Sequence, residues 1–230
     1  MKNDSQRREQ ALAWYEAAFE AGLPQAQYRM ATFYQAGQYF NHRADYLEIF
    51  EKACAQDYAP ACNDIGVHYL EKLHYRQAPD YLLKAIRLGS IVAISNLAYM
   101  YASGLGVQAD ENRSQELYLE AAMLGRNMSQ LQVAMNYYRG IGVGKDYKRS
   151  YAWALVSELD ETDPETSAEA QTTTENVRFM LERLLSVSQK EQSLTLAREL
   201  LDEIDQNRTA HLAQYGDRDT IHHRRAQAQR

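Results

Sequence analysis

Residues 93–125 read AISNLAYMYASGLGVQADENRSQELYLEAAMLG, and they contain two helical patterns separated by a glycine-rich turn. In the first pattern, Ala93 and Leu97 stand four residues apart, and Tyr101 follows one turn later on the same stripe. The second pattern ends at Gly125, where glycine suits the left-handed position after a helix. The stretch therefore predicts a helix–turn–helix unit.

The same unit recurs along the chain, in steps of 35, 32 and 36 residues. Equivalent positions of the units, here called columns, keep the same chemical character. In the second helix of each unit, a bulky residue is followed four positions later by a small residue. Large residues of one helix can then fill the space beside small residues of another. The tyrosines are Tyr34, Tyr69, Tyr101 and Tyr137; the small column is Ala18, Ala53, Ala85, Ala121 and Ser157; the bulky column is Trp14, Ile49, Tyr81, Leu117 and Trp153.

The composition agrees with an all-α protein. Hydrophobic residues make up 45% of the 230 residues and charged residues 24%, values that are typical of folded globular chains. Only 4 prolines are present, which favours helix almost throughout. The net charge of −6 gives no basic excess to neutralise phosphates, so we expect no nucleic-acid partner. No run of 18 apolar residues occurs, and we expect no membrane span.

The repeated pattern resembles the Sel-one-like repeat (SLR) family, which is related to the tetratricopeptide repeats. Residues 93–125 match its pattern A-x3-L-[GA]-x2-Y, G-x-G-V-x2-D and A-A-x2-G almost throughout. The next unit, 129–161, matches until it loses the closing Ala-Ala-x2-Gly, and the two earlier units keep the helix columns without G-x-G-V. The resemblance covers roughly residues 10–161 and implies a right-handed α-solenoid of about four units.

The turn of the unit also has the spacing G-x-G-x-x-A, which can hold a dinucleotide pyrophosphate after a β-strand. Here each copy follows a helical stripe, and the glycines return 36 residues later. We therefore interpret them as structural turn residues, expect Asp110 and Asp146 to cap the following helices, and expect no cofactor. The turn glycines are Gly104, Gly106, Gly140 and Gly142.

The pattern divides the chain into three parts. The solenoid is expected at 1–161, a helical hairpin that caps it at 162–206, and a disordered polar and basic tail at 207–230. An acidic break separates the first two parts. Within the cap, Ser188 and Glu191 form the pattern of a capping box, which predicts the start of a helix that ends near residue 204.

Cys54 and Cys62 are the only two cysteines. Their positions in the last turn of one helix and the first turn of the next can bring them within bridging distance. Their C-x7-C spacing resembles the cysteine-rich SLR branch, which is secreted or periplasmic and in which such pairs form disulfides. The alternative is two buried, reduced thiols. The N-terminus has no apolar signal-like run, which favours a cytoplasmic protein, and a start upstream of Met1 would allow a periplasmic or secreted one.

Neither metal binding nor catalysis is indicated. Cys62 and His68 stand six residues apart and so lie on different faces of a helix, and no C-x2-C or H-x3-H pair occurs with Cys54 or His74. No G-x-S-x-G or Ser-x2-Lys motif marks a nucleophile. The sequence therefore predicts no metal, no catalytic residue and no enzyme.

A binding face is predicted on the first helix of each unit, because these helices line the inner surface of helical-pair solenoids. Positions outside the packing stripe combine aromatic, polar and thioether groups, which suit protein or peptide recognition. The predicted contact residues are Tyr28, Thr32, Asn63, Ser95, Tyr99, Met135 and Tyr138.

The predicted function is that of a non-catalytic adaptor or regulator that binds a protein or peptide partner. Two alternatives stay open. One is a β-lactam-binding or hydrolysing enzyme, as the resemblance to cysteine-rich SLR proteins implies. The other is an immunity or chaperone-like protein whose acidic surface binds a basic partner. Neither the identity of the partner nor the oligomeric state follows from the sequence.

Overall fold

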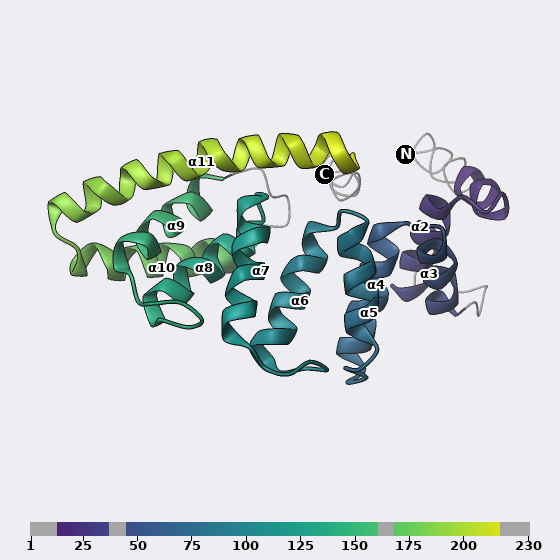
Figure 1. The fold of residues 1–230 in the computed structure, drawn as a ribbon. Coiled ribbons are helices and arrows are strands. Elements are labelled where there is room, and N and C mark those ends of the chain that lie inside the picture. The colour runs from purple at the N-terminus through teal and green to yellow at the C-terminus, as the bar shows by residue number, and fades with distance from the viewer. Residues whose placement is uncertain (1–12, 37–44, 161–167, 217–230) are drawn as a thin grey trace. The chain divides into compact units, whose positions relative to one another are not determined.

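The computed structural model describes residues 13–36, 45–160 and 168–216, and all elements in these ranges are helices. The protein has the α-solenoid fold, built from antiparallel helical pairs (Figure 1). It divides into two compact units, Met1–Ser90 and Ile91–Arg230.

The first unit contains four complete helices after a helical segment at 13–20. Within the unit, the first of these helices packs on the second, the second on the third and the third on the fourth. Three of them have a proline in the first turn, where the missing N–H costs no helical hydrogen bond. The helices are α2 (Pro24–Gln35), α3 (Tyr46–Ala55), α4 (Ala59–Glu71) and α5 (Ala78–Arg87).

A disulfide joins Cys54 of α3 to Cys62 of α4, and both side chains are buried. The turn between these helices contains Asp57, which adopts a left-handed conformation with φ of 60°. From α5, the Lys84 ammonium donates to the Cys54 carbonyl oxygen at 2.7 Å and pairs with the Asp57 carboxylate at 3.1 Å. The covalent bond and this cation together fix the turn between α3 and α4.

Among its described residues, the second unit has two helical hairpins and two further helices that pack on them. The hairpins α6–α7 and α8–α9 repeat the predicted unit, and α10 packs on α8 and α9. The long α11 packs on α9 and α7, so it covers the side formed by the second helices (Figure 1). The helices are α6 (Ile91–Ser103), α7 (Glu111–Met123), α8 (Asn127–Arg139), α9 (Tyr147–Leu159), α10 (Ala168–Leu184) and α11 (Val187–Tyr215).

The glycine turns of the second unit depend on positive φ angles. Gly104 and Gly106 have φ of 66° and 71°, and Gly140 and Gly142 have φ of 79° and 63°. Such angles are costly for residues with a side chain. An aspartate then starts each second helix: the Asp110 carboxylate accepts from the Arg113 N–H, and Asp146 accepts from two N–H groups of α9. The two predicted caps are confirmed.

The predicted packing of large against small residues holds for most of the series. The small column is fully buried at Ala53, Ala85 and Ala121, while Ile49, Leu117 and Trp153 are also buried. Tyr81 is half-buried. The prediction is wrong for Trp14, whose side chain is 80% exposed. No described helix precedes the segment at 13–20. Among the described residues, the Trp14 indole ring therefore has no row of small residues on a preceding helix to pack against.

The start and length of α11 differ from the prediction. The capping box is made by Ser186 and Gln189 instead of Ser188 and Glu191, because Ser186 has the extended backbone (φ −67°, ψ 164°) that a helix start requires. The helix also continues past Ile204 to Tyr215, so residues 207–215 are helical where the sequence predicts a tail. Beyond Gly216, the predicted disordered tail lies outside the described residues.

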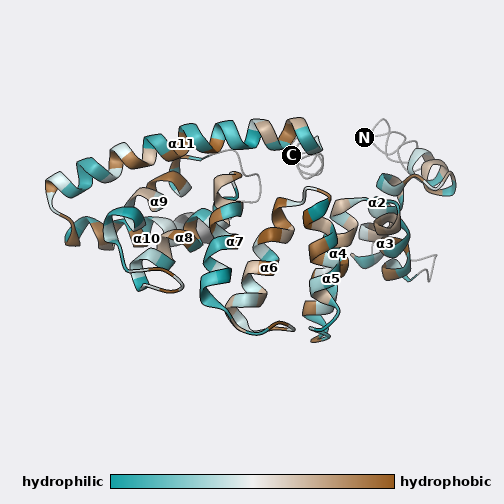
Figure 2. Ribbon diagram, viewed as in Figure 1, coloured by the Kyte–Doolittle hydropathy of each residue, from teal (hydrophilic) through white to brown (hydrophobic). Residues whose placement is uncertain are grey.

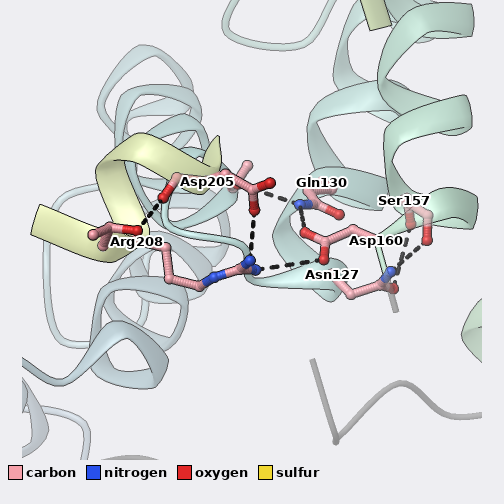
Figure 3. Close-up of polar contacts among 8 residues, drawn as sticks. Asn127, Gln130, Ser157, Asp160, Asp205 and Arg208 are labelled. Carbon is pink, nitrogen blue, oxygen red and sulfur yellow. Dashed lines mark hydrogen bonds and ion pairs between the residues drawn. The ribbon is translucent and has the colours of Figure 1, made fainter. Parts of the chain in front are cut away.

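A buried carboxylate holds the second half of α11 against the repeats (Figure 3). Asp160, at the end of α9, accepts a hydrogen bond from the Gln130 amide at 2.8 Å and pairs with the Arg208 guanidinium at 3.6 Å. Arg208 also donates to Asp205 at 2.6 Å. Ion pairs in buried surroundings stabilise only when their other polar atoms are satisfied, a condition that Gln130 helps Asp160 to meet. The extension of α11 to Tyr215 places Arg208 at this point.

A second polar contact lies next to this carboxylate. The Asn127 amide donates to the Ser157 carbonyl oxygen, and the Ser157 hydroxyl bonds back to the Asn127 oxygen at 3.3 Å. The same hydroxyl lies 3.4 Å from that of Thr174 in α10. Helices α8, α9 and α10 are thus joined by hydrogen bonds within the core.

We expect Gly142→Ala to destabilise the protein by about 3 kcal/mol or more. A Cβ atom at this position would lie 2.0 Å from the Glu111 carbonyl oxygen of α7, and φ is positive there. The control is Gly144→Ala, because a Cβ atom there meets nothing within 4 Å. Urea unfolding measures both variants, and a Gly142→Ala protein as stable as the control would contradict close packing of the turn on α7.

Asp160→Ala is expected to lower the free energy of unfolding by about 2 kcal/mol, because the buried Gln130 amide loses its acceptor and Arg208 loses the carboxylate that ties α11 to α9. Asp205→Ala removes only the exposed partner of Arg208 and is expected to cost less than about 0.5 kcal/mol. Hydrogen exchange provides a local readout. Amides in the second half of α11 should exchange faster in Asp160→Ala alone, and equal exchange in the two variants would argue against this anchor.

Candidate protein-binding face on α6 and α8

Helices α6 and α8 touch near their N-terminal ends in the second unit. The Ser95 hydroxyl of α6 is hydrogen-bonded to the Ser129 hydroxyl of α8, with the oxygens 2.8 Å apart. Because α11 packs on the second helices α7 and α9, it leaves side chains of α6 and α8 accessible. These side chains form the candidate site, which we call the α6/α8 face: Asn96, Tyr99, Met128, Gln132, Met135 and Tyr138.

The apolar side chains of the α6/α8 face are partly exposed to solvent, and some of them also pack against neighbouring side chains. Tyr99 is the most exposed aromatic residue of the face, at 51%, and Met128 is 43% exposed. Met135 is half-buried, and so is Tyr138, whose ring packs against Tyr147 at a centroid distance of 5.7 Å. Aromatic and thioether side chains in such positions can act as anchors or adapt to a partner surface.

Amide groups add directional hydrogen bonding to the face. The Gln132 amide donates to the Asn136 oxygen at 2.8 Å, and the Asn136 amide donates to the Gln115 oxygen of α7 at 2.6 Å. The chain of bonds holds Gln132 in one orientation and ties α8 to α7. The Gln115 Nε2 atom, buried at the end of this chain, has no hydrogen-bond partner.

A second tyrosine supports the face from α7. Burial, and to a smaller extent the neighbouring Tyr99, raises the pKa of Tyr118 to about 12. The Tyr118 phenol therefore stays neutral throughout the physiological range and adds no charge beneath the face. Its half-buried ring packs against the hydrophobic core of the unit.

The predicted contact residues of the first unit make internal contacts. The Tyr28 hydroxyl donates to the Asp64 carboxylate at 2.9 Å, and its ring lies 5.5 Å from that of Phe50. Burial, followed by the charge of Asp64, raises the pKa of this phenol above its ordinary value. Thr32 donates to its own helix, and Asn63 is buried. These three side chains therefore contribute to the packing of the first unit.

In the second unit, the structure brings Ser95 into the contact between α6 and α8 and leaves Tyr99, Met135 and Tyr138 at the surface. Sequence reasoning missed Asn96, Met128 and Gln132. A signal was present for the two amides, since Asn96 and Gln132 occupy equivalent positions 36 residues apart, and Asn96 directly follows the predicted contact residue Ser95. Contact of any of these residues with a partner stays a prediction.

Within the described ranges, no group of three His, Cys, Asp or Glu side chains could hold a metal ion. The four residues considered from the sequence are engaged elsewhere: the cysteines form the disulfide, His68 bonds to the Tyr46 hydroxyl at 3.2 Å, and His74 stacks on Tyr69. Among the helices that the structure describes, none has the length and apolar character needed to span a membrane.

The fold and the turns together define a helical-repeat protein of the α-solenoid class. The family profile of the Sel1 repeat matches residues 5–23, 24–58, 91–125 and 127–155, slightly more than half of the chain. The chain therefore belongs to the Sel1 repeat family, as the sequence resemblance predicted.

The profile does not match residues 59–90, although α4 and α5 form a helical pair there. Residues 72–77 read KLHYRQ, without the G-x-G-V of the later units, and the left-handed position is occupied by Leu73 with φ of 61°.

Two solved structures share the fold. One is a protective antigen present in uropathogenic Escherichia coli strains that displays an SLR fold, with a TM-score of 0.74 and 24% identity over 89% of this chain and 43% of that one. The other is a Sel1 repeat protein from Oxalobacter formigenes, with a TM-score of 0.65 and 24% identity over 84% of this chain and 74% of that one.

The chain spans less than half the length of the antigen. At this level of identity, both similarities show the fold alone. A search among curated proteins found no match. Sel1 repeat proteins generally act as helical scaffolds for protein interaction.

Proposed function

We propose that this protein is a non-catalytic adaptor or regulator that binds a protein or peptide segment along the α6/α8 face. The observation that carries the proposal is the position of α11, which covers α7 and α9 and leaves Tyr99, Met135 and Tyr138 accessible on the other layer. Family membership supports a binding function.

The chemistry of the face suits an extended peptide. Amide side chains such as Gln132 can donate to and accept from a peptide backbone, and Gln132 is already held by Asn136. Tyr99 and Met128 offer apolar surface for side chains of the partner. Because less rotamer freedom is lost when the site is already ordered, the hydrogen-bond chain to α7 lowers the entropic cost of binding.

Affinity capture from native cells followed by mass spectrometry identifies partners, and isothermal titration with the purified partner then measures affinity. We expect the double variant Tyr99→Ala/Tyr138→Ala to weaken binding by about 2 kcal/mol, roughly thirtyfold. The control is Leu212→Ala, which truncates an exposed side chain on α11. If the double variant binds as tightly as the control, the partner does not use the α6/α8 face.

We further propose that the protein works in an oxidising compartment, such as the periplasm or the extracellular space. Disulfides persist in such compartments and are rare in the cytosol. The Cys54–Cys62 bond is buried between two helices, where Lys84 holds the same turn. This proposal departs from the cytoplasmic expectation based on the N-terminal sequence.

Protein isolated from native cells is expected to resist alkylation at both cysteines until it is reduced, as intact mass spectrometry would show. Cys54→Ser/Cys62→Ser should lower stability by about 2–3 kcal/mol, the value expected for closing a short loop. Two freely alkylated thiols in native protein, with no effect of reductant on unfolding, would contradict the oxidising compartment.

A further inference from the structure

Helix α10 has a second apolar side that no other described helix covers. Its packed side presents Val177, Leu181 and Leu185 to the core, all of them buried. Phe179 is 60% exposed, the adjacent Met180 is 43% exposed, and Leu184, one turn after Met180, is 53% exposed. Figure 2 shows hydrophobic residues at the outer end of the hairpin formed by α10 and α11.

The helical geometry separates these two sides. Two residues along a helix correspond to about 200° of rotation, so Phe179 points nearly opposite to Leu181. A phenylalanine in this position adds nothing to the core of its own chain. Exposed apolar side chains that adjoin one another commonly mark an interaction site.

Charged residues stand at equal distances on either side of this phenylalanine. Glu175 precedes Phe179 by four residues, Arg183 follows it by four, and both side chains are exposed. They lie about 12 Å apart along the helix, too far to pair with each other. Among the α10 side chains that the structure describes, the other two charged residues are paired, since Arg178 forms ion pairs with Glu158 and Glu182.

We propose that this side of α10, defined by Glu175, Phe179, Met180, Arg183 and Leu184, binds the same side of a second copy of the chain, with the two helices antiparallel. A two-fold axis at Phe179 places each Glu175 opposite the Arg183 of the other copy, and the two Phe179 rings meet between these pairs. In a symmetric dimer each contact occurs twice, so the pattern is self-complementary.

The charge order selects the antiparallel arrangement. If the two helices were parallel, Glu175 would face Glu175 and Arg183 would face Arg183, and like charges opposed across an interface cost several kcal/mol. The surface offered by one helix side is smaller than the roughly 800 Å² per partner of a typical stable interface. The dimer is therefore weak, with a dissociation constant on the order of 10–100 μM.

Sedimentation equilibrium of the full chain, at concentrations up to about 200 μM, measures this constant. Phe179→Ala is expected to raise it at least about tenfold, since the ring lies at the centre of the contact. Glu199→Arg changes an exposed charge on α11 and should leave it unchanged. Circular dichroism and thermal melting verify that each variant is folded.

Charge reversal gives the decisive comparison. Glu175→Arg and Arg183→Glu each place like charges opposite one another and should raise the dissociation constant at least about tenfold. Mixing these two variants should restore association as a heterodimer, and the double variant Glu175→Arg/Arg183→Glu should again form homodimers. A wild-type protein that stays monomeric, or a double variant as weak as the single ones, would overturn the proposal.

Discussion

The close approach of neighbouring helices at small residues is the constraint on which the rest of the structure depends. Ala53, Ala85 and Ala121 have no exposed surface, and each lies four residues after a larger side chain of the same helix. At Gly66 even one added carbon would come within 2.7 Å of Leu82. Interiors packed to this density leave few alternative arrangements, so the repeated columns define which helix faces meet.

The turns follow from the same requirement. Most of the short connections between consecutive packed helices contain a residue with a positive φ angle. Glycine supplies these angles in the second unit at Gly104, Gly106, Gly140 and Gly142. The first unit combines Gly22 and Gly89 with two non-glycine residues, Asp57 and Leu73, whose positive φ angles cost roughly 1 kcal/mol each. At Asp57 the ion pair with Lys84 and the adjacent disulfide offset part of that cost.

Features encoded locally could be predicted from the sequence. The helices, the glycine turns and the Asp110 and Asp146 caps depend on neighbouring residues, and the structure has all of them. The positions of Cys54 and Cys62 across a helix–helix turn allowed a bridge, and the resemblance supported it, but the sequence alone left two reduced thiols as the alternative. The exposure of Trp14 could not be predicted, because it depends on which helices are adjacent in space rather than on helical spacing.

The extent of α11 depends on still longer-range contacts. Nothing local to residues 205–215 requires that segment to be helical, and the sequence alone favours a polar tail there. The partner that fixes it, Asp160, lies at the end of α9 and is bound from the other side by Gln130 of α8. Likewise, the role of Gln132 becomes visible only once Asn136 and Gln115 are placed together.

The position of α11 has a functional consequence for the repeats. A solenoid unit has two layers, and a long helix fixed across α7 and α9 makes them unavailable to a partner. A buried charge is costly unless it is paired and hydrogen-bonded. The contacts of Asp160 with Arg208 and Gln130 therefore favour the observed position of α11 over one shifted along its axis by a helical turn. In the proposed function, a partner therefore binds to α6 and α8, where hydrogen-bonded amides and exposed tyrosine and methionine side chains occur together.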